Sequence, residues 1–440
     1  MIKIHELKQQ EAQLLGFDSY INLSLAKKMA TEEDVMKLQG ELAEAFKPLA
    51  LRELAELTEF ARTKLGLDKL EAFDIAFASE HLKKARFNLD DNFIREYFPE
   101  QRVIQGMCEV VRRLFGVVLI EEQHFDRWDP DAKLFSVYDS DETKLGEIYM
   151  DLYARSGEKR AGAWMQKAQV YLSTGDKEQL PIAFLSTNFT KGDGLKSSLL
   201  CHREVQTTFH EFGHCLHHIL SKVPYPSLAG VFGVLWDVVE APSQMMENWV
   251  WDVEGLKLFS GHCQTGEPLP KEITEALSKN KHFNAGMDVL QQLVYGVFDF
   301  NVYRQLKPHT SEGLHQLWLD TFRSIQVTPI DDYNHMPNGF HHIFSGGYSA
   351  GYYTYKWSLN MANDMFSVFK ERGIFDGATC RAYRKGVLEP GGSEPFKTLL
   401  ENFLGRELRC DASVRAIMGT PEVVEGGLAP GLEAVARAAR

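Results

Sequence analysis

The chain has 440 residues, of which 44% are hydrophobic and 25% are charged, a composition typical of a globular protein with room for a large core. Its formal net charge is −13 at pH 7, from 61 acidic residues against 48 lysines and arginines. This balance argues against a nucleic-acid-binding protein, because no basic excess is present to attract phosphates.

The cysteines and the N-terminal segment indicate where the protein resides. Six cysteines are scattered along the chain without a C-x-x-C pair, which is typical of free thiols in a reducing compartment. The first residues, MIKIHELKQQEAQLLGF, lack the apolar core of a signal peptide, and no apolar run reaches membrane-spanning length. We therefore expect a cytoplasmic protein that does not interact with a membrane.

Residues 3 to about 115 are predicted to be helical. Apolar residues recur at spacings of three and four from Val35 to Leu49, which is the pattern of a helix with one buried face. Pro99 interrupts this pattern before a further helix around Met107.

The pattern changes at Gly116, where short β-rich runs begin. They predict strands at 117–122, 133–140, 145–153, 168–173 and 182–190. The stretch 139–143 predicts a hairpin turn. We expect one small antiparallel sheet directly before the next helix. Its edge could bind an extended peptide as an added strand, or the strands could only support that helix, and both interpretations stay open.

Helices return at residue 202 and are expected to continue to about 418. The segment 420–440 holds several glycines and an Ala/Arg-rich end, and we expect it to be a peripheral tail. No internal repeat or linker divides the chain. The simplest organisation is one mostly α domain of α+β type over residues 1–419, with helices in 1–115, a sheet in 116–190 and helices in 202–419.

The helix predicted over 204–220 contains His210-Glu-Phe-Gly-His214, an H-E-x-x-H pentapeptide. Its apolar residues form one stripe, and both histidines lie on the opposite side, one turn apart. Two imidazoles at that spacing can bind one metal ion. Glu211 points about 100° round the helix and can reach a water on that ion without being a ligand. Two surface histidines on an ordinary helix would give the same pentapeptide, so the motif needs support elsewhere.

A catalytic zinc site takes three protein ligands and leaves one position for water. The metzincin pattern is excluded, because Leu220 stands where that pattern has its third histidine. His217 is expected to pack or to support the site rather than to bind metal. The better candidate is Glu240, 26 residues after His214, at the start of a helix whose first turn holds Pro242.

Two further acidic residues share the predicted face of Glu240. Asp237 and Glu247 are rival ligands or groups that orient the imidazoles, and Asp237 also suits an N-terminal capping charge. Cys215 projects away from the ligand face and is predicted to pack in the core.

Two longer motifs surround these residues. They are HEFGHCLHH followed by DVVEAPSQMMENW, and FHHIFSGGYSAGYYTYKW over residues 340–357. Together they resemble the thimet-oligopeptidase family of zinc metallopeptidases, most closely its bacterial oligopeptidases and dipeptidyl carboxypeptidases. The segments DLYAR, GAWM and GGSEPF also resemble family segments. The resemblance extends from about Leu14 to Gly419, and two long motifs in the same order make it specific.

The resemblance implies a helical zincin-type catalytic domain that hydrolyses peptide bonds in oligopeptides and uses one Zn²⁺ ion. It implies that His210, His214 and Glu240 bind the zinc. It also implies that Glu211 is the general base acting on zinc-bound water.

The second motif implies further roles within the same family pattern. His342 and Tyr355 correspond to donors to the tetrahedral intermediate, and Tyr348 and Tyr352 correspond to substrate contacts on a mobile loop. Tyrosine O–H and imidazole N–H are neutral donors, and each donor aimed at an oxyanion can be worth about 3 kcal/mol. His341 is the adjacent rival of His342, and the motif spacing favours His342.

The chain departs from the family pattern at its N-terminal side. Family members carry a long helical region ahead of the point where this chain begins, and that region forms one wall of a channel that admits only short peptides. The resemblance implies that this wall is missing or much reduced, so substrate size selection is left open.

A homo-oligomer or a partner chain is one way to replace that wall. The alternatives to a self-sufficient enzyme are therefore one half of a split peptidase and a non-catalytic peptide-binding module. Glu211 argues against the binding module, because a binder has no use for a general base, but it does not argue against the split enzyme.

Overall fold

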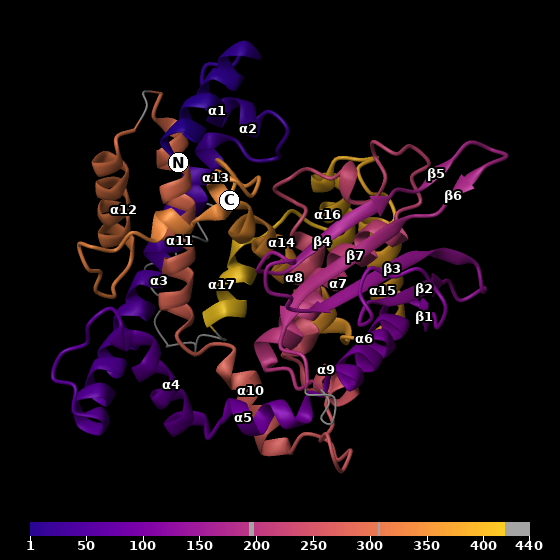
Figure 1. Cartoon of the computed structure of the whole chain (residues 1–440), viewed down its shortest axis with the longest axis horizontal. Helices are drawn as coiled ribbons and strands as arrows, with labels where there is room; N and C mark the ends of the chain where they lie inside the picture. The colour runs from indigo at the N-terminus through magenta and orange to yellow at the C-terminus, as the bar shows by residue number, and fades with distance from the viewer. Residues whose placement is uncertain (193–197, 307–308, 419–440) are drawn as a thin grey trace.

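The computed structural model describes residues 1–192, 198–306 and 309–418. Helices dominate it, and one small mixed sheet is inserted between two helical regions (Figure 1), which confirms the expected mostly α, α+β fold. The predicted tail at 420–440 lies outside the described residues, and the division into one domain over 1–419 stays a prediction. None of the described helices combines the length and the apolar composition that crossing a bilayer requires.

The N-terminal helices run from the start of the chain to Phe115. They are α1 (Ile2–Leu14), α2 (Tyr20–Leu25), α3 (Glu32–Phe60), the π-helical turn η1 (Ala61–Leu65), α4 (Asp74–Phe87), α5 (Asp91–Ile94), the 3₁₀ turn η2 (Arg95–Tyr97) and α6 (Glu100–Phe115). Thr31 and Asp34 cap α3 reciprocally, since each side chain accepts a hydrogen bond from the other's backbone N–H. Pro99 directly precedes α6, as the sequence predicts.

The sheet has the strand order β1-β2-β3-β7-β4. Its strands and the separate two-stranded hairpin are β1 (Val118–Glu121), β2 (Lys133–Tyr138), β3 (Lys144–Tyr153), β4 (Trp164–Gln169), β5 (Leu172–Ser173), β6 (Glu178–Gln179) and β7 (Ile182–Phe189). Asp139 N–H donates to the carbonyl of Thr143 at 2.8 Å, which confirms the turn predicted between β2 and β3.

Two details of the predicted sheet are wrong. The sheet is not entirely antiparallel, because β3 and β7 pair in parallel, with Ile148 opposite Ala183. A parallel pair needs a crossover connection, and the segment that holds β4, β5 and β6 supplies it. The strand predicted at 168–173 runs instead from Trp164 to Gln169, because its Gln, Lys and Ala residues give little β signal and the pairing with β7 fixes it.

The inner face of the sheet packs on α7 (His202–Leu220), the helix that carries the H-E-x-x-H motif. Ile148, Met150, Ala183 and Leu185 are completely buried in this layer. The sheet therefore supports α7, as one of the two interpretations expects. The strand β4 forms an edge of the sheet, so the addition of a peptide strand there stays a prediction.

Helices follow the sheet to the end of the described chain. After α7 they are η3 (Gly230–Phe232), α8 (Ala241–Met246), η4 (Glu247–Val250), α9 (Val253–Phe259), α10 (Lys271–Asn280), α11 (Ala285–Arg304), α12 (Ser311–Ile325), η5 (Met336–Gly339), α13 (His341–Phe344), α14 (Thr354–Arg372), α15 (Gly377–Tyr383), η6 (Arg384–Leu388), α16 (Phe396–Leu404) and α17 (Cys410–Met418).

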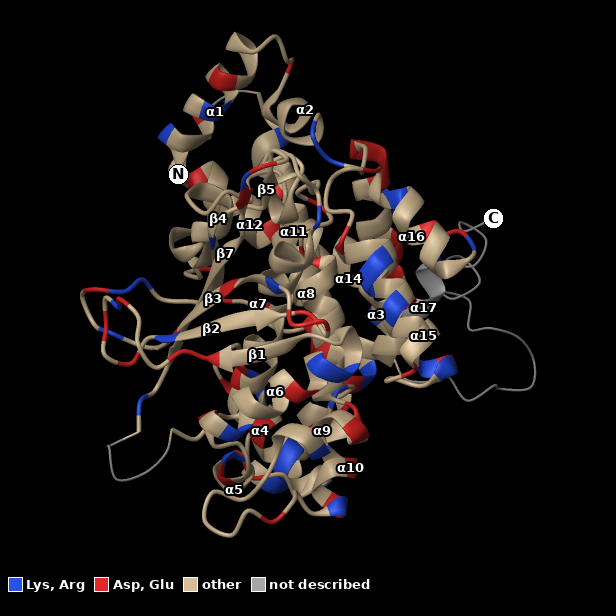
Figure 2. Ribbon diagram, turned by 90° about the vertical axis from the view of Figure 1, so that its right-hand side faces the viewer, with Lys and Arg blue, Asp and Glu red and all other residues tan. Residues whose placement is uncertain are grey.

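The helices and the sheet form two sides of the molecule, and the predicted metal-binding residues lie between these sides. Helices α3, α11 and α12 pack together on one side, and the sheet with α6 and α7 lies on the other, with α8, α14 and α17 in between (Figure 1). In the view turned by 90°, Lys and Arg are interspersed with Asp and Glu along outer helices such as α6, α9 and α10 (Figure 2).

Candidate metal centre

Helix α7 presents the two histidines as its sequence pattern predicts. The apolar stripe, with Val205, Phe209 and Phe212, is completely buried against the sheet and neighbouring helices. His210 and His214 lie on the opposite side and are half-buried. At the start of the helix, the Glu204 carboxylate accepts the backbone N–H of Cys201 at 2.8 Å and so satisfies one of the free donors there.

Glu240 reaches the histidines because α8 packs closely on α7. It directly precedes α8, and Pro242 stands in the first turn of that helix, as expected. The close approach depends on Gly213, since a Cβ atom there would lie 2.6 Å from the Cα of Ser243. Gly213 therefore has a packing role that the pentapeptide alone did not reveal.

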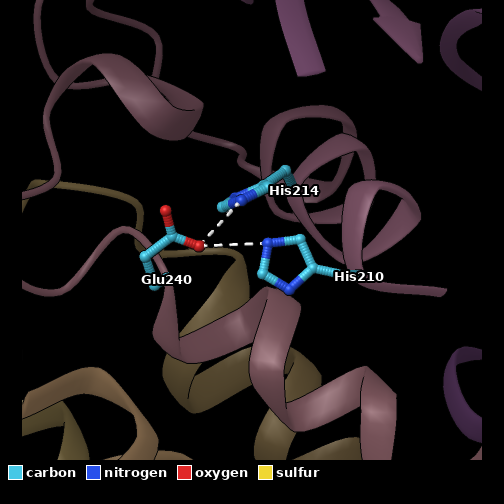
Figure 3. A group of neighbouring side chains, drawn as sticks. All are labelled: His210, His214 and Glu240. Atoms are coloured by element: carbon cyan, nitrogen blue, oxygen red, sulfur yellow. Dashed lines mark ion pairs between the residues drawn. The ribbon is translucent and has the colours of Figure 1, made fainter. Parts of the chain in front are cut away.

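The three predicted ligands converge on one point. The Nε2 atoms of His210 and His214 each lie 3.2 Å from Oε2 of Glu240 (Figure 3). One potential ligand atom from each residue lies within 4.8 Å of the other two. Two imidazoles and one carboxylate are a donor set that suits zinc, and only 3% of Glu240 is exposed. A carboxylate so deeply buried needs positive charge beside it, so the chemistry of this group fits a divalent cation.

Glu247 orients one of the imidazoles, which is one of the roles foreseen for it. Its Oε1 lies 2.7 Å from Nδ1 of His210, and its Oε2 accepts a hydrogen bond from Gln206 at 2.6 Å. With Nδ1 donating to the carboxylate, the other ring nitrogen of His210 is left with a lone pair facing Glu240.

Asp237 does none of the things expected of it. Its carboxylate accepts hydrogen bonds from the backbone N–H groups of Met29 and Ala30 and from the hydroxyl of Tyr353. It therefore neither binds with the imidazoles nor caps α8. Its partners come from residues 29–30 and from Tyr353, both distant in the sequence, so no local pattern around position 237 reveals them.

Glu211 is buried beside the three candidate ligands, with 6% of its surface exposed. Burial raises the pKa of its carboxyl group, and this effect is opposed by the nearby imidazoles of His210 and His214. A carboxylate whose pKa is moved toward neutrality is suited to accept and return a proton.

The two other residues discussed around the motif pack in the core. His217 is completely buried, neither of its ring nitrogens has a hydrogen-bond partner among the described residues, and burial lowers its pKa to about 3. It is a neutral packing residue. Cys215 is also completely buried, as predicted.

The tyrosine segment, residues 341–355, lies over the candidate ligands. The rings of Tyr348 and Tyr355 stack with centroids 5.0 Å apart, and the ring of His342 lies 6.3 Å from Tyr355. The Tyr348 hydroxyl donates a hydrogen bond to Oε1 of Glu240, a contact that sequence reasoning did not foresee. The ring of His341 instead contacts the hydroxyl of Ser345, the residue that follows its short helix α13.

Protonation in this segment suits hydrogen-bond donation. Burial, and then the charge of Glu240, raise the pKa of Tyr355 well above its ordinary value, so its O–H stays neutral. Burial lowers the pKa of His342, so a neutral imidazole is favoured at neutral pH. The Tyr352 hydroxyl donates a hydrogen bond to Oε1 of Gln292 at 3.1 Å.

A buried carboxylate that the sequence analysis missed holds the backbone of this segment. Asp299 of α11 accepts the backbone N–H groups of Ala350, Gly351 and Tyr352 at 2.7–2.9 Å. Ala350 has a left-handed backbone, with φ of +47°. Lys28 adds a hydrogen bond to the carbonyl of Ala350 at 2.9 Å. A single acidic residue in the apolar run 294–300 is a signal that could have pointed to Asp299, whereas no such signal marks Lys28.

Comparisons with known proteins agree with the family resemblance. The profile of the family described as Peptidase family M3 matches residues 1–419. Oligopeptidase A of Escherichia coli (strain K12) is 40% identical over 414 residues, which are 94% of this chain and 61% of that protein. Dipeptidyl carboxypeptidase of Salmonella typhimurium is 28% identical over 412 residues, 93% of this chain and 60% of that protein. The chain thus spans about three fifths of the length of these relatives.

A solved structure shares the fold. The structure titled "PZ peptidase A with inhibitor 2" superposes with a TM-score of 0.60 at 20% identity, and the match covers 94% of this chain and 64% of that chain. At that identity, the likeness concerns the arrangement of the elements alone.

Proposed function

The chain belongs to peptidase family M3, and we propose that it is a zinc-dependent metallopeptidase that hydrolyses peptide bonds in oligopeptides. The observation that carries this proposal is the convergence of His210, His214 and Glu240 beside a buried Glu211. The substrate class is supported by the oligopeptidase relatives, whose names state it.

We propose that one zinc ion is held by Nε2 of His210, Nε2 of His214 and a carboxylate oxygen of Glu240. When bound, zinc would polarise the substrate carbonyl and lower the pKa of water, so that hydroxide would be available as the nucleophile near neutral pH. Glu247 keeps His210 in the tautomer that offers Nε2 to the metal.

Glu211 is the proposed general base. Its carboxylate takes a proton from the attacking water and then gives it to the nitrogen of the leaving amine. Burial favours this role, because it raises the pKa of Glu211 and keeps bulk water away from the proton being carried. A non-catalytic binder would have no use for a buried carboxylate at this place.

Tyr355 and His342 are the proposed donors to the oxyanion that forms on the scissile carbonyl. Both are neutral donors at neutral pH and lie close to one another above the candidate ligands. Tyr348 and Tyr352 are proposed to contact the substrate. The Tyr348 hydroxyl, which donates to Glu240, would also help to fix the orientation of that carboxylate.

The Glu211→Gln variant tests the general base. It should bind zinc as the wild type does, because Glu211 is not a proposed ligand, but its turnover of a fluorogenic oligopeptide should fall by about 10²- to 10⁴-fold. The matched control is Glu254→Gln, whose side chain is 63% exposed on α9 and which should be as active as the wild type. Zinc content by mass spectrometry and initial rates give the answer. Hydrolysis by Glu211→Gln at the wild-type rate would show that the mechanism is wrong.

Peptides of graded length test whether the chain acts alone. A self-sufficient enzyme should cleave at least the short peptides once zinc is supplied, lose activity with a chelator and regain it with added zinc. A chain that is one half of a split peptidase should show no hydrolysis until a second protein is added. Cleavage of long unfolded chains would indicate an open cleft.

A further inference from the structure

A cavity of about 540 Å³ lies beside the candidate metal centre. Its walls come from α7, α8, the end of α10, the start of α11, α14 and α17. Polar side chains dominate among its lining residues, which include Arg203, Gln206, Gln244, Glu247, Lys281 and Lys356.

Three contacts connect the cavity wall to groups with a proposed part in catalysis. Glu247 lines the cavity and contacts Nδ1 of His210, and Gln292 lines it and shares a hydrogen bond with the Tyr352 hydroxyl. Gln244 donates a hydrogen bond to the carbonyl of Tyr355 at 3.0 Å. A ligand in this cavity would therefore lie next to both the metal ligands and the tyrosine segment.

Three cationic side chains and two carboxylates line the cavity, so the formal charge of its lining is positive. Lys281 and Lys356 line it as half-buried side chains, and Arg203 stands exposed at its rim. The lining carboxylates are Glu247 and Asp288. Both oxygens of Glu247 are already engaged, one by His210 and one by Gln206. The ammonium group of Lys356 makes no ion pair or hydrogen bond within the described part of the chain, and only the more distant charges of Asp288 and Glu247 act on it.

Burial lowers the pKa of each lysine to about 8. Both side chains therefore still carry most of their charge at neutral pH. An anion bound beside either lysine would reduce the cost of keeping a cation in this partly desolvated space.

We propose that this cavity is a subsite for a carboxylate group of the peptide substrate, supplied by its C-terminus or by an acidic side chain. Lys281, Lys356 and Arg203, which line the cavity, attract the carboxylate. The inference rests on the proposed peptidase function, and it adds what that function leaves open, namely a chemical feature by which substrates are selected.

Binding to the zinc-loaded Glu211→Gln variant tests the subsite without turnover. Three fluorescent peptides of one sequence are compared by anisotropy: the free acid, the C-terminal amide, and the amide with a glutamate in its last position. The free acid should bind about tenfold more tightly than the plain amide, as expected of a hydrogen-bonded charge pair. The ratio should fall toward one when Lys281→Met or Lys356→Met is added.

Lys271→Met is the matched control, because Lys271 begins the same helix that ends beside Lys281 and its side chain is 85% exposed. It should keep the tenfold ratio. Should Lys356→Met fail to fold by circular dichroism, Lys281→Met and the rim variant Arg203→Gln provide the same comparison. Tight binding of the glutamate-bearing amide would assign the carboxylate to a side chain, and loss of its binding would assign it to the C-terminus.

Equal binding of acid and plain amide, or no binding of either, would overturn the inference. The wild-type enzyme separates this failure from failure of the proposed function. If Glu211→Gln discriminates between the peptides while the wild type hydrolyses none of them, the subsite stands and the peptidase proposal falls. If the wild type hydrolyses acid and amide with equal kcat/KM and the variant binds them equally, the peptidase proposal stands and the subsite falls.

Discussion

Helices α7 and α8 (the metal helices) and the tyrosine segment face each other across the candidate metal centre, but they are held in place in different ways. His210 and His214 lie on α7 and Glu240 directly precedes α8, and these two helices, connected by residues 221–240, pack closely at Gly213. The position of the tyrosine segment depends on residues that are distant in the sequence, since Lys28 donates a hydrogen bond to the carbonyl of Ala350, 322 positions away. One side is determined by local spacing and the other by tertiary contacts, so the two should respond differently to substitution.

The largest effect is expected from a substitution in the tyrosine segment. Tyr355→Phe removes one proposed oxyanion donor and keeps the ring that stacks on Tyr348. We expect kcat/KM to fall about 10²-fold while zinc affinity is unchanged, since Tyr355 is not a proposed ligand. Steady-state rates and a zinc titration measure the two quantities separately. A loss of zinc together with activity would contradict the proposed division between the two sides.

The sequence predicted where His210, His214 and Glu240 lie, whereas their role as zinc ligands stays a prediction. The i, i+4 spacing of His210 and His214 fixes their relative position on any helix, and Pro242 located the start of the helix that follows Glu240. The contact of Glu247 with His210 was one of the roles foreseen for it and is observed at 2.7 Å.

The sequence could not predict how distant segments meet. The spacing of Asp237 predicts a position beside the candidate ligands, but its carboxylate accepts hydrogen bonds from Met29, Ala30 and Tyr353. The parallel pairing of β3 and β7 was missed for the same reason, because pairing depends on strand order and not on strand composition. The proposed roles of Glu211, His342, Tyr348, Tyr352 and Tyr355 stay predictions.

An intermediate effect is expected from substitution of Glu247, which orients the proposed metal ligand His210. Glu247→Gln keeps the shape of the side chain but replaces a charged acceptor of the His210 N–H with a neutral one. We expect zinc affinity to fall about 10- to 100-fold, as for similar supporting groups, and activity to return at saturating zinc. Competition with a zinc-binding dye measures the affinity. Persistent inactivity at saturating zinc would show that Glu247 does more than orient the imidazole.

The smallest effect is expected from substitution of Asp299. This substitution is also the most direct test of whether the metal helices and the tyrosine segment are independent of each other. Asp299→Asn leaves one oxygen to accept the three backbone N–H groups of the tyrosine segment and turns an amide NH₂ toward donors. The loss should lower the free energy of unfolding by about 1–3 kcal/mol and lower kcat/KM about tenfold, because Tyr352 and Tyr355 are then less firmly placed.

Zinc affinity decides how the Asp299 result is interpreted. The metal helices do not contact the Asp299 carboxylate through any described hydrogen bond, so zinc affinity should stay within about twofold of the wild type. Asp320→Asn on the neighbouring helix α12 is the control, since Asp320 is exposed and should change neither stability nor rate. If Asp299→Asn weakened zinc binding as strongly as it slowed hydrolysis, the metal helices and the tyrosine segment would form a single coupled unit. The local spacing of α7 and α8 would then not suffice to build the metal side, because its geometry would depend on the same distant contacts.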